Sequence, residues 1–444
     1  MSDLFIIGAS GTRAYRQAMA AISENIANAS TEGYSRRSLT TIESGSSTST
    51  MATYTPRANF GGTEVKGVNR AADPYLDAAV RYTGTALSNS TARLRWMTDL
   101  EGALNDTDTG IGKLMTAMYQ NIDKLAASPS DTSLRVTTLD SISRVAEAFQ
   151  RTSADLAQVS AGIATEAQSS VETINRSINQ LADINNSLLR AQPGTSAYAQ
   201  LLDSRDAALN TLSANVNVDI SFGAHDMATI NYNGTTLVQG QNATTVALTV
   251  NANGTLSLAT SGGAALTAPS NGTLGGLFSA ASTATQRRTS LDTLAQQFVT
   301  DMNAWHAQGR TDANAAGGAL LSGTTAATVT ALITDPAALA TKSTDGTLNG
   351  NLLNAGTVLR GNGSVESGWT SIIATQANLL ASIKAEQTTA QGRSDQAIAA
   401  REAVSGVDLD MEAAELLRLQ QAYSGSAKIL QVAKETVDAI LQII

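Results

Sequence analysis

The 444-residue sequence has no cysteine, only two histidines, and aromatic side chains at 4% of its positions. Without cysteine there are no disulfides, thiolate metal ligands or cysteine nucleophiles. His225 and His306 lie far apart, and neither has a second histidine nearby, so no zinc motif of the His-Glu-x-x-His type exists. Paired carboxylates for glycoside hydrolysis stay open, because any two could meet in space. We expect no catalytic residue, no metal site and no cofactor.

Long apolar runs and high charge are also absent. No segment is long and apolar enough to cross a bilayer. Phe5-Ile6-Ile7, with no basic residue before it, is too short for the core of a signal peptide. Charged residues make up 15% of the chain, and the net charge of -9 argues against nucleic acid and anionic lipid as partners. We interpret the longest basic runs, Arg36-Arg37 and Arg287-Arg288, as solvated surface.

Each end of the chain carries an apolar stripe. From Val407 to Ile444, apolar residues recur every seventh position, and a second set is offset by three, which is typical of a long coiled-coil helix. A similar stripe of smaller residues runs from Leu4 to Ala29. The two ends therefore pair either with each other or with copies of the same chain. The expected interface residues are Leu4, Ile7, Ile22, Ile26, Leu409, Leu416, Leu419, Tyr423, Leu430, Val437 and Ile440.

Small residues interrupt both stripes. They are Gly11, Ala14, Ala18, Gly425, Ser426 and Ala427. In one interpretation each glycine merely weakens its helix, by about 1 kcal/mol. In the other, which we favour, the small residues allow two helices to approach closely.

Helical periodicity between the two ends predicts long helices over residues 74–100, 111–127, 132–190, 197–212, 277–307 and 369–403. The third of these helices would extend for about 80 Å at about 1.5 Å per residue. Alternating apolar residues predict a strand over 63–68 and a set of strands from Val216 onward, with a hairpin turn at Asn233-Gly234. Residues 106–110 resemble a calcium loop without its final carboxylate, and predict a turn between helices.

We therefore expect a mainly α fold with an inserted antiparallel β domain. The expected parts are terminal coiled-coil helices over 1–35 and 405–444, an elongated helical rod over 36–213 and 273–404, and a compact, outward-facing β domain over 214–272. Residues 322–368 show little periodicity, and their structure is left open.

Two motifs beside the terminal stripes are more specific. Residues 25–36 read NIANASTEGYSR, and residues 405–410 read SGVDLD, with QQAY at 420–423. These motifs resemble the paired terminal signatures of the bacterial flagellar axial proteins, which are the rod, hook and hook-associated proteins. The stretches LLDSRD at 201–206, LVQG at 237–240 and GGL at 275–277 are similar to the hook-associated members. The signature residues are Asn25, Asn28, Gly33, Tyr34, Arg36, Ser405, Gly406, Asp408 and Gln421.

This resemblance implies a structural subunit of the flagellum that connects hook to filament. It also implies an extracellular location on the flagellum, reached through the flagellar secretion apparatus without a cleaved signal peptide. The implied partners are copies of the chain in a tubular ring, the hook protein, a second hook–filament junction protein, and a cytoplasmic export chaperone. Neither nucleic-acid binding nor membrane insertion is expected.

Two alternatives remain. A hook or distal-rod protein usually carries Phe where Tyr34 stands, and lacks the Leu-Leu-Asp-x-Arg-Asp stretch. A secreted adhesin or enzyme carried on flagellar-type termini would need a ligand-binding or catalytic insert. The only insert expected here, residues 214–272, is small and contains one histidine and no tryptophan.

Overall fold

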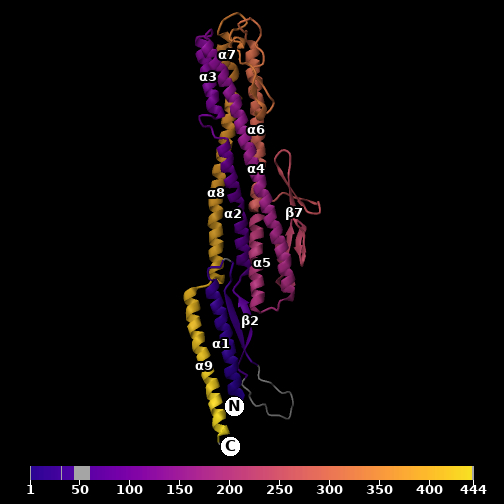
Figure 1. Cartoon of the computed structure of the whole chain (residues 1–444), viewed down its shortest axis with the longest axis vertical. Helices are drawn as coiled ribbons and strands as arrows, with labels where there is room; N and C mark the ends of the chain where they lie inside the picture. Colours follow the sequence, from indigo (N-terminus) through magenta and orange to yellow (C-terminus); the bar gives the residue numbers. More distant parts are fainter. Residues whose placement is uncertain (1, 32, 45–60, 443–444) are drawn as a thin grey trace. The chain divides into compact units, whose positions relative to one another are not determined.

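The structure is a computed structural model that describes residues 2–31, 33–44 and 61–442 (Figure 1). Its helices and strands are α1 (Ser2–Asn28), β1 (Arg37–Glu43), β2 (Thr63–Arg70), α2 (Pro74–Ala103), α3 (Ile111–Ala127), α4 (Thr132–Arg190), α5 (Ser196–Asn215), β3 (Asp219–Phe222), β4 (Ala228–Tyr232), β5 (Thr235–Gln239), β6 (Asn242–Ala243), β7 (Val246–Val250), β8 (Leu256–Thr260), β9 (Ala265–Leu266), α6 (Gly272–Gln308), β10 (Leu321–Ser322), β11 (Thr330–Ala331), α7 (Gly350–Leu359), α8 (Val365–Ser405) and α9 (Leu409–Leu441). The mainly α fold with inserted antiparallel strands is confirmed. Within the described ranges, no helix is both long and apolar enough to cross a membrane.

The chain divides into two compact units. The first comprises Met1–Thr85, Thr173–Thr245 and Gln391–Ile444, and the second comprises Ala86–Glu172 and Val246–Ala390. The first unit holds the helix pair α1 and α9, the hairpin β1–β2, helix α5 and the sheet β3–β4–β5–β6. The second holds α3, α6, α7 and the sheet β7–β8–β9.

Each unit has its own core. In the first, Asn185 of α4 attaches the four-stranded sheet, because its side-chain amide donates to the carbonyls of Ala228 and Gly240, both at 2.8 Å, and accepts from Ala228 N–H at 2.9 Å. In the second, large side chains are buried together, with the Phe149 and Phe298 rings 5.6 Å apart between centroids.

Most helix boundaries follow the expected ones. Helix α2 starts at Pro74, and the Asp73 carboxylate caps it by accepting from Tyr75 N–H at 2.8 Å. Asp106 accepts from Gly112 N–H at 2.9 Å, at the start of α3. The expected turn between helices at residues 106–110 is thus confirmed.

The strands differ from expectation in two respects. Strand β3, the first within residues 214–272, begins at Asp219 rather than Val216. The reason is that Val216 N–H still donates to the Leu212 carbonyl at 2.9 Å, in the last turn of α5. The strands within 214–272 form two separate sheets. The hairpin at Asn233-Gly234 is confirmed, with positive φ at both residues, 45° and 86°. The proposed domain boundaries stay a prediction.

Candidate assembly site

The first unit pairs the two ends of the chain. Helices α1 and α9 lie side by side (Figure 1) and are in extensive contact. The buried residues of α9 are spaced every seventh position, at Glu412, Leu419, Ser426 and Ala433. This is the offset set of the coiled-coil pattern, and it faces α1. Of the two arrangements left open by the sequence, the structure shows the ends of one chain paired with each other.

Glycines set the distance between the two helices. A Cβ on Gly8 would lie 2.8 Å from Leu430 Cγ, and one on Gly11 would lie 2.6 Å from Ser426 Oγ. Both separations are shorter than those of real Cβ atoms, so any larger residue would have to displace the Leu430 or Ser426 side chain. The expected close approach is confirmed at Gly11 and Ser426. It does not extend to Gly425, where an added Cβ would meet open space.

The structure spreads the expected interface residues over covered and uncovered faces. Ile22 and Leu419 are buried, whereas Ile7, Ile26, Leu416, Leu430 and Val437 are half-buried and Leu4, Leu409, Tyr423 and Ile440 are exposed. The paired helices therefore leave part of the apolar stripe of α9 open to solvent.

Asn25 fixes the end of α1 to both the arm and α9. Its side chain is fully buried, and all of its hydrogen-bonding groups have partners. The amide group donates to the Arg37 carbonyl at 2.9 Å and to Glu412 Oε2 at 3.0 Å. Its oxygen accepts from Arg37 N–H at 2.9 Å and from the Tyr34 hydroxyl at 2.8 Å. One side chain thus joins α1, the strand β1 and α9.

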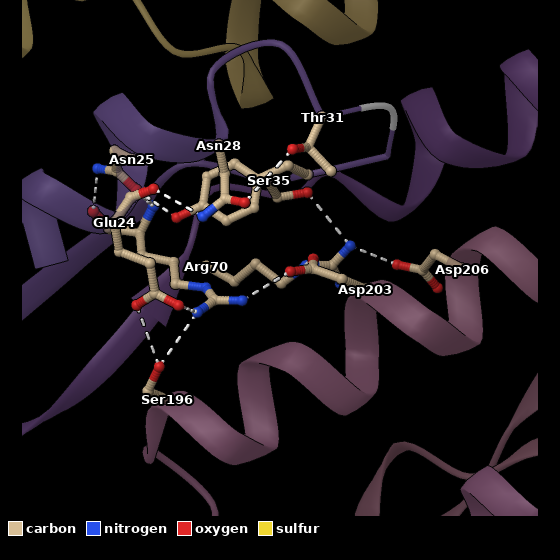
Figure 2. Close-up of polar contacts among 11 residues, drawn as sticks. Glu24, Asn25, Asn28, Thr31, Ser35, Arg70, Ser196, Asp203 and Asp206 are labelled. Atoms are coloured by element: carbon tan, nitrogen blue, oxygen red, sulfur yellow. Dashed lines mark hydrogen bonds and ion pairs between the residues drawn. The ribbon is translucent and has the colours of Figure 1, made fainter.

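A network of buried charges continues from this point (Figure 2). Arg37 pairs with Glu24 of α1 and, at 3.0 Å, with Asp203 of α5. Arg70 of β2 lies between two carboxylates of α5, with Nε 2.5 Å from Asp203 and Nη2 2.6 Å from Asp206. Since these arginine side chains are at most 9% exposed, the carboxylates supply the charge that their burial requires. The network joins α1, the β1–β2 hairpin and α5.

Electrostatics keep the Tyr34 hydroxyl a hydrogen-bond donor. Burial raises the pKa of the Tyr34 phenol to about 12, although the nearby Arg37 guanidinium opposes this. The hydroxyl therefore stays protonated over the physiological range, as its bond to Asn25 requires. The Arg37 guanidinium also lies over the Tyr34 ring, 5.1 Å from its centroid.

Most of the other signature residues shape the chain around this network. Gly33 adopts a φ of 80°, which glycine reaches without strain. Arg36 N–H donates to the Ser405 carbonyl at 2.9 Å, which brings the two signatures together. Gly406 N–H donates to the Glu402 carbonyl at 2.8 Å, at the end of α8. The Asp408 carboxylate begins α9 by accepting from two backbone N–H groups, at 3.0 and 3.1 Å.

Asn28 and Gln421 have lesser roles. Asn28 donates from its side chain to the Glu24 carbonyl at 2.9 Å, within α1. Gln421 lies on an exposed face of α9, so the structure does not bring it to the other signature residues. The two signature segments line one surface cavity of about 660 Å³, which includes Tyr34 and Asp408.

Several residues of the network were not expected. The interpretation of the two basic pairs as solvated surface is wrong for one arginine in each, since Arg37 is 4% and Arg287 is 8% exposed. Arg287 donates to the Gln376 side chain at 3.0 Å within the second unit. The LLDSRD stretch offered a signal, because two acidic residues one helical turn apart on a buried helix need cationic partners. Nothing in the sequence identified those partners as Arg37 and Arg70.

The role of this site is to hold segments of the chain together. Its polar groups bind one another, and their geometry holds three chain segments in register. Among the residues that the structure describes, no group of three or more His, Asp or Glu side chains could hold a metal ion. The arrangement is that of a structural site.

Comparisons with known proteins give the same class. A family model described as the flagellar hook-associated protein FlgK helical domain matches residues 97–321. A model of the C-terminal part of the flagellar basal body rod FlgEFG proteins matches 402–443, and a model of flagella basal body rod proteins matches 6–34. The terminal segments are therefore of the type found in flagellar rod proteins, whereas the interior is of the hook-associated type.

Individual relatives agree. Flagellar hook-associated protein 1 of Bacillus subtilis (strain 168) is 24% identical over 485 residues, which cover 96% of this chain and 95% of the relative. Its counterpart in Salmonella typhimurium (strain LT2) is 28% identical over 330 residues, 70% of this chain and 57% of the relative. The solved structure of the flagellar hook junction protein FlgK from Burkholderia pseudomallei is similar in fold, with a TM-score of 0.50 and 23% identity over 56% of this chain and 46% of that one.

The chain is thus a structural protein of the bacterial flagellum, and it is not an enzyme. Because the helical-domain model matches half of its length, the chain belongs to the flagellar hook-associated protein FlgK family.

Proposed function

We propose that this chain connects the flagellar hook to the filament, and that copies of it join through the helix pair α1–α9. The observation that carries the proposal is the division of the α9 stripe between two faces. The set at Glu412, Leu419, Ser426 and Ala433 is covered by α1, whereas Leu409 and Tyr423 of the other set stay exposed by 53% and 37%. Ile440, which continues the covered set toward the end of α9, is also exposed, by 45%. A neighbouring copy would cover the second set.

Apolar burial supplies the driving force for this joining. Full burial of one large apolar side chain contributes about 1.5–3 kcal/mol. Further apolar side chains on α9, such as Met411, Leu417 and Leu441, are 58–65% exposed. They enlarge the surface that assembly would remove from water. Several such residues on each copy would offset the entropy lost when subunits are fixed.

The finer partners follow from the family. Copies of the chain would form a tubular ring that contacts hook protein on one side and a second junction protein on the other. Before export, a cytoplasmic chaperone would bind the C-terminal segment. Export would proceed through the flagellar secretion apparatus without a cleaved signal peptide, and the protein would act outside the cell. A hook or distal-rod role is disfavoured because the match over 97–321 is to the hook-associated type.

A genetic experiment tests the junction role. Cells that lack the gene should build hooks without attached filaments and should release flagellin into the medium. A plasmid copy of the wild-type gene should restore swimming. Full filaments on the deletion strain, with no second copy of the gene, would refute the role.

A pair of variants tests the assembly surface. Tyr423→Asp places a charge on the uncovered stripe, where burial by a neighbour would leave it unpaired. Ser424→Asp adds the same charge one residue along, on a different face of the exposed helix. We expect both purified variants to fold, and only Tyr423→Asp to fail in restoring filaments. Normal swimming with Tyr423→Asp would contradict assembly through this stripe.

A further inference from the structure

Residues 309–349 of the second unit have little regular structure, yet they cover buried apolar side chains. The segment contains only the short strands β10 and β11 and two 3-10 turns. Leu320, Leu321 and Leu339 are nonetheless at most 1% exposed. Something other than a backbone ladder must hold such a segment closed.

Polar side chains of neighbouring helices hold it. Asn303 of α6 accepts from Leu320 N–H at 2.7 Å and from Leu321 N–H at 3.0 Å, and donates to the Leu321 carbonyl at 2.9 Å. Asn351 of α7 donates to the Ala340 carbonyl at 2.8 Å. These two amides do not titrate, so their bonds are independent of pH.

The third such side chain does titrate. His306, near the end of α6, is fully buried. Its Nδ1 lies 2.6 Å from the Gly318 carbonyl, and its Nε2 lies 2.8 Å from the Ala340 backbone nitrogen. A carbonyl only accepts and an N–H only donates, so the ring must be neutral, with its proton on Nδ1. The segment also lies so close to α6 that position 317 requires glycine, since a Cβ there would lie 2.1 Å from the His306 carbonyl oxygen.

The segment carries the charged residues Arg310, Asp312, Asp335, Lys342 and Asp345. From the neighbouring helices, Arg135 of α4 pairs with Asp312, and Asp292 of α6 accepts from Ala326 N–H at 2.8 Å. Asp312 accepts from Arg135 at 2.6 Å and lies 3.8 Å from Lys342. Burial lowers the pKa of His306, and its backbone hydrogen bonds oppose this. Arg135 also holds the pKa of Asp312 below its usual range, so that carboxylate stays ionised in mild acid.

We propose that His306 is an acid-sensitive latch, whose protonation at Nε2 releases residues 309–349 from α6. In the closed structure Nε2 accepts the Ala340 N–H, so an added proton would place two N–H groups against each other. The proton is therefore bound more readily when the segment opens, even though backbone hydrogen bonds to Gly318 and Ala338 favour the protonated ring in the closed form. Opening would expose the buried leucines of the segment itself and leave the core of α3, α4 and α6 in place.

The direction of the pH effect follows from linkage. In the open segment the imidazole has an ordinary pKa of about 6.5, whereas in the closed one it is lower. The latch is therefore at full strength above that value and weakens as pH falls below it. One proton is taken up per opening, so the protection of the segment's amides falls about tenfold per pH unit below that point. Between pH 7.5 and pH 5.5 the fall is about tenfold in total, because the transition begins within that interval.

The wild-type protein provides the first test. In full-length protein labelled at histidine, NMR should show that the His306 ring stays neutral in the closed form. Hydrogen exchange, corrected for the intrinsic effect of pH, should show the tenfold loss of protection in 309–349 and no comparable loss in β4–β5. If His306 becomes protonated while the segment stays protected, the latch does not exist.

Variants separate the latch from general acid damage. His306→Gln offers a donor and an acceptor of similar reach but does not titrate, so the loss of protection between pH 7.5 and 5.5 should disappear. His225→Asn, the matched control, should keep that loss, and Asn tolerates the φ of 56° at that position. An unchanged pH dependence in His306→Gln would refute the proposal. If that variant does not fold, the titration of His306 in the wild-type protein decides.

Discussion

Replacing Asn25 with Asp would separate the two ends of the chain without changing the size of the side chain. The change removes the amide that donates to the Arg37 carbonyl and to Glu412. One buried carbonyl is left without a donor, which costs about 1–3 kcal/mol. Two carboxylates then face each other, where the wild-type distance is 3.0 Å between nitrogen and oxygen.

The repulsion is the larger effect. Two unit charges about 4 Å apart cost about 4 kcal/mol at an effective dielectric constant near 20. The alternative, protonating one carboxyl at pH 7, costs about the same, since about three pH units separate pH 7 from its ordinary pKa. The sum is about 5–7 kcal/mol, which is comparable to the whole stability of many domains. Hydrogen exchange of the α1 and α9 amides at pH 7 should therefore reveal an open helix pair.

The pH dependence gives this prediction a distinctive sign. In the closed pair the new carboxyl has a raised pKa, so the penalty is full above that pKa. It shrinks as pH falls toward the ordinary value near 4, because the closed state then binds the extra proton. Acidification should thus partly restore the variant.

A second substitution provides the control. Glu412→Gln supplies an amide that can donate to the new carboxylate at position 25, so the double variant should recover most of the protection. Gln421→Glu, which adds a carboxylate in place of an amide on an exposed face of α9, should have little effect. Full protection in Asn25→Asp at pH 7, or no recovery with Glu412→Gln, would refute the role assigned to Asn25.

Three further predictions concern local packing and charge. Gly8→Val should open the helix pair, as measured by hydrogen exchange of α9, and Leu430→Ala should partly restore it, because the added carbon would lie 2.8 Å from Leu430 Cγ. Asp203→Asn should destabilise the first unit by about 3–5 kcal/mol, measured by denaturant unfolding, because it leaves two buried guanidinium groups without that carboxylate; Asp155→Asn, at an exposed site, should not. Gly234→Ala should weaken the β4–β5 hairpin by about 1–2 kcal/mol, measured by its hydrogen exchange, because its φ is 86°.

Local signals were sufficient for most of the secondary structure. Helix α3 occupies the predicted residues 111–127, because Ser128-Pro129 ends a regular apolar pattern there. Residues 322–368 gave no comparable signal. Their stability comes from side-chain bonds such as those of His306 and Asn351 to Ala340, which have no period in sequence.

Only part of the candidate assembly site could be predicted from the sequence. The sequence motifs pointed to Asn25, Tyr34 and Ser405, but not to their contacts. Arg37 meets Asp203 across 166 residues, and no local pattern encodes a pairing at that range. The predicted interface residues were large and apolar, and whether copies of the chain join through them stays a prediction. The seam that α1 covers includes small side chains such as Ser426 and Ala433, because the two backbones come too close for larger ones.

The bond between Asn25 and Glu412 spans 387 positions of sequence. During synthesis α1 is therefore made long before the helix that covers it. A polypeptide terminated between residues 391 and 405 would contain the whole second unit, but its α1 would lack α9. The helix pair therefore reports on whether synthesis has reached α9, and a prematurely ended copy would lack the surface through which we propose that copies join. Defective subunits would then be excluded from assembly without a separate checking step, since only a polypeptide that includes α9 can form the α1–α9 pair.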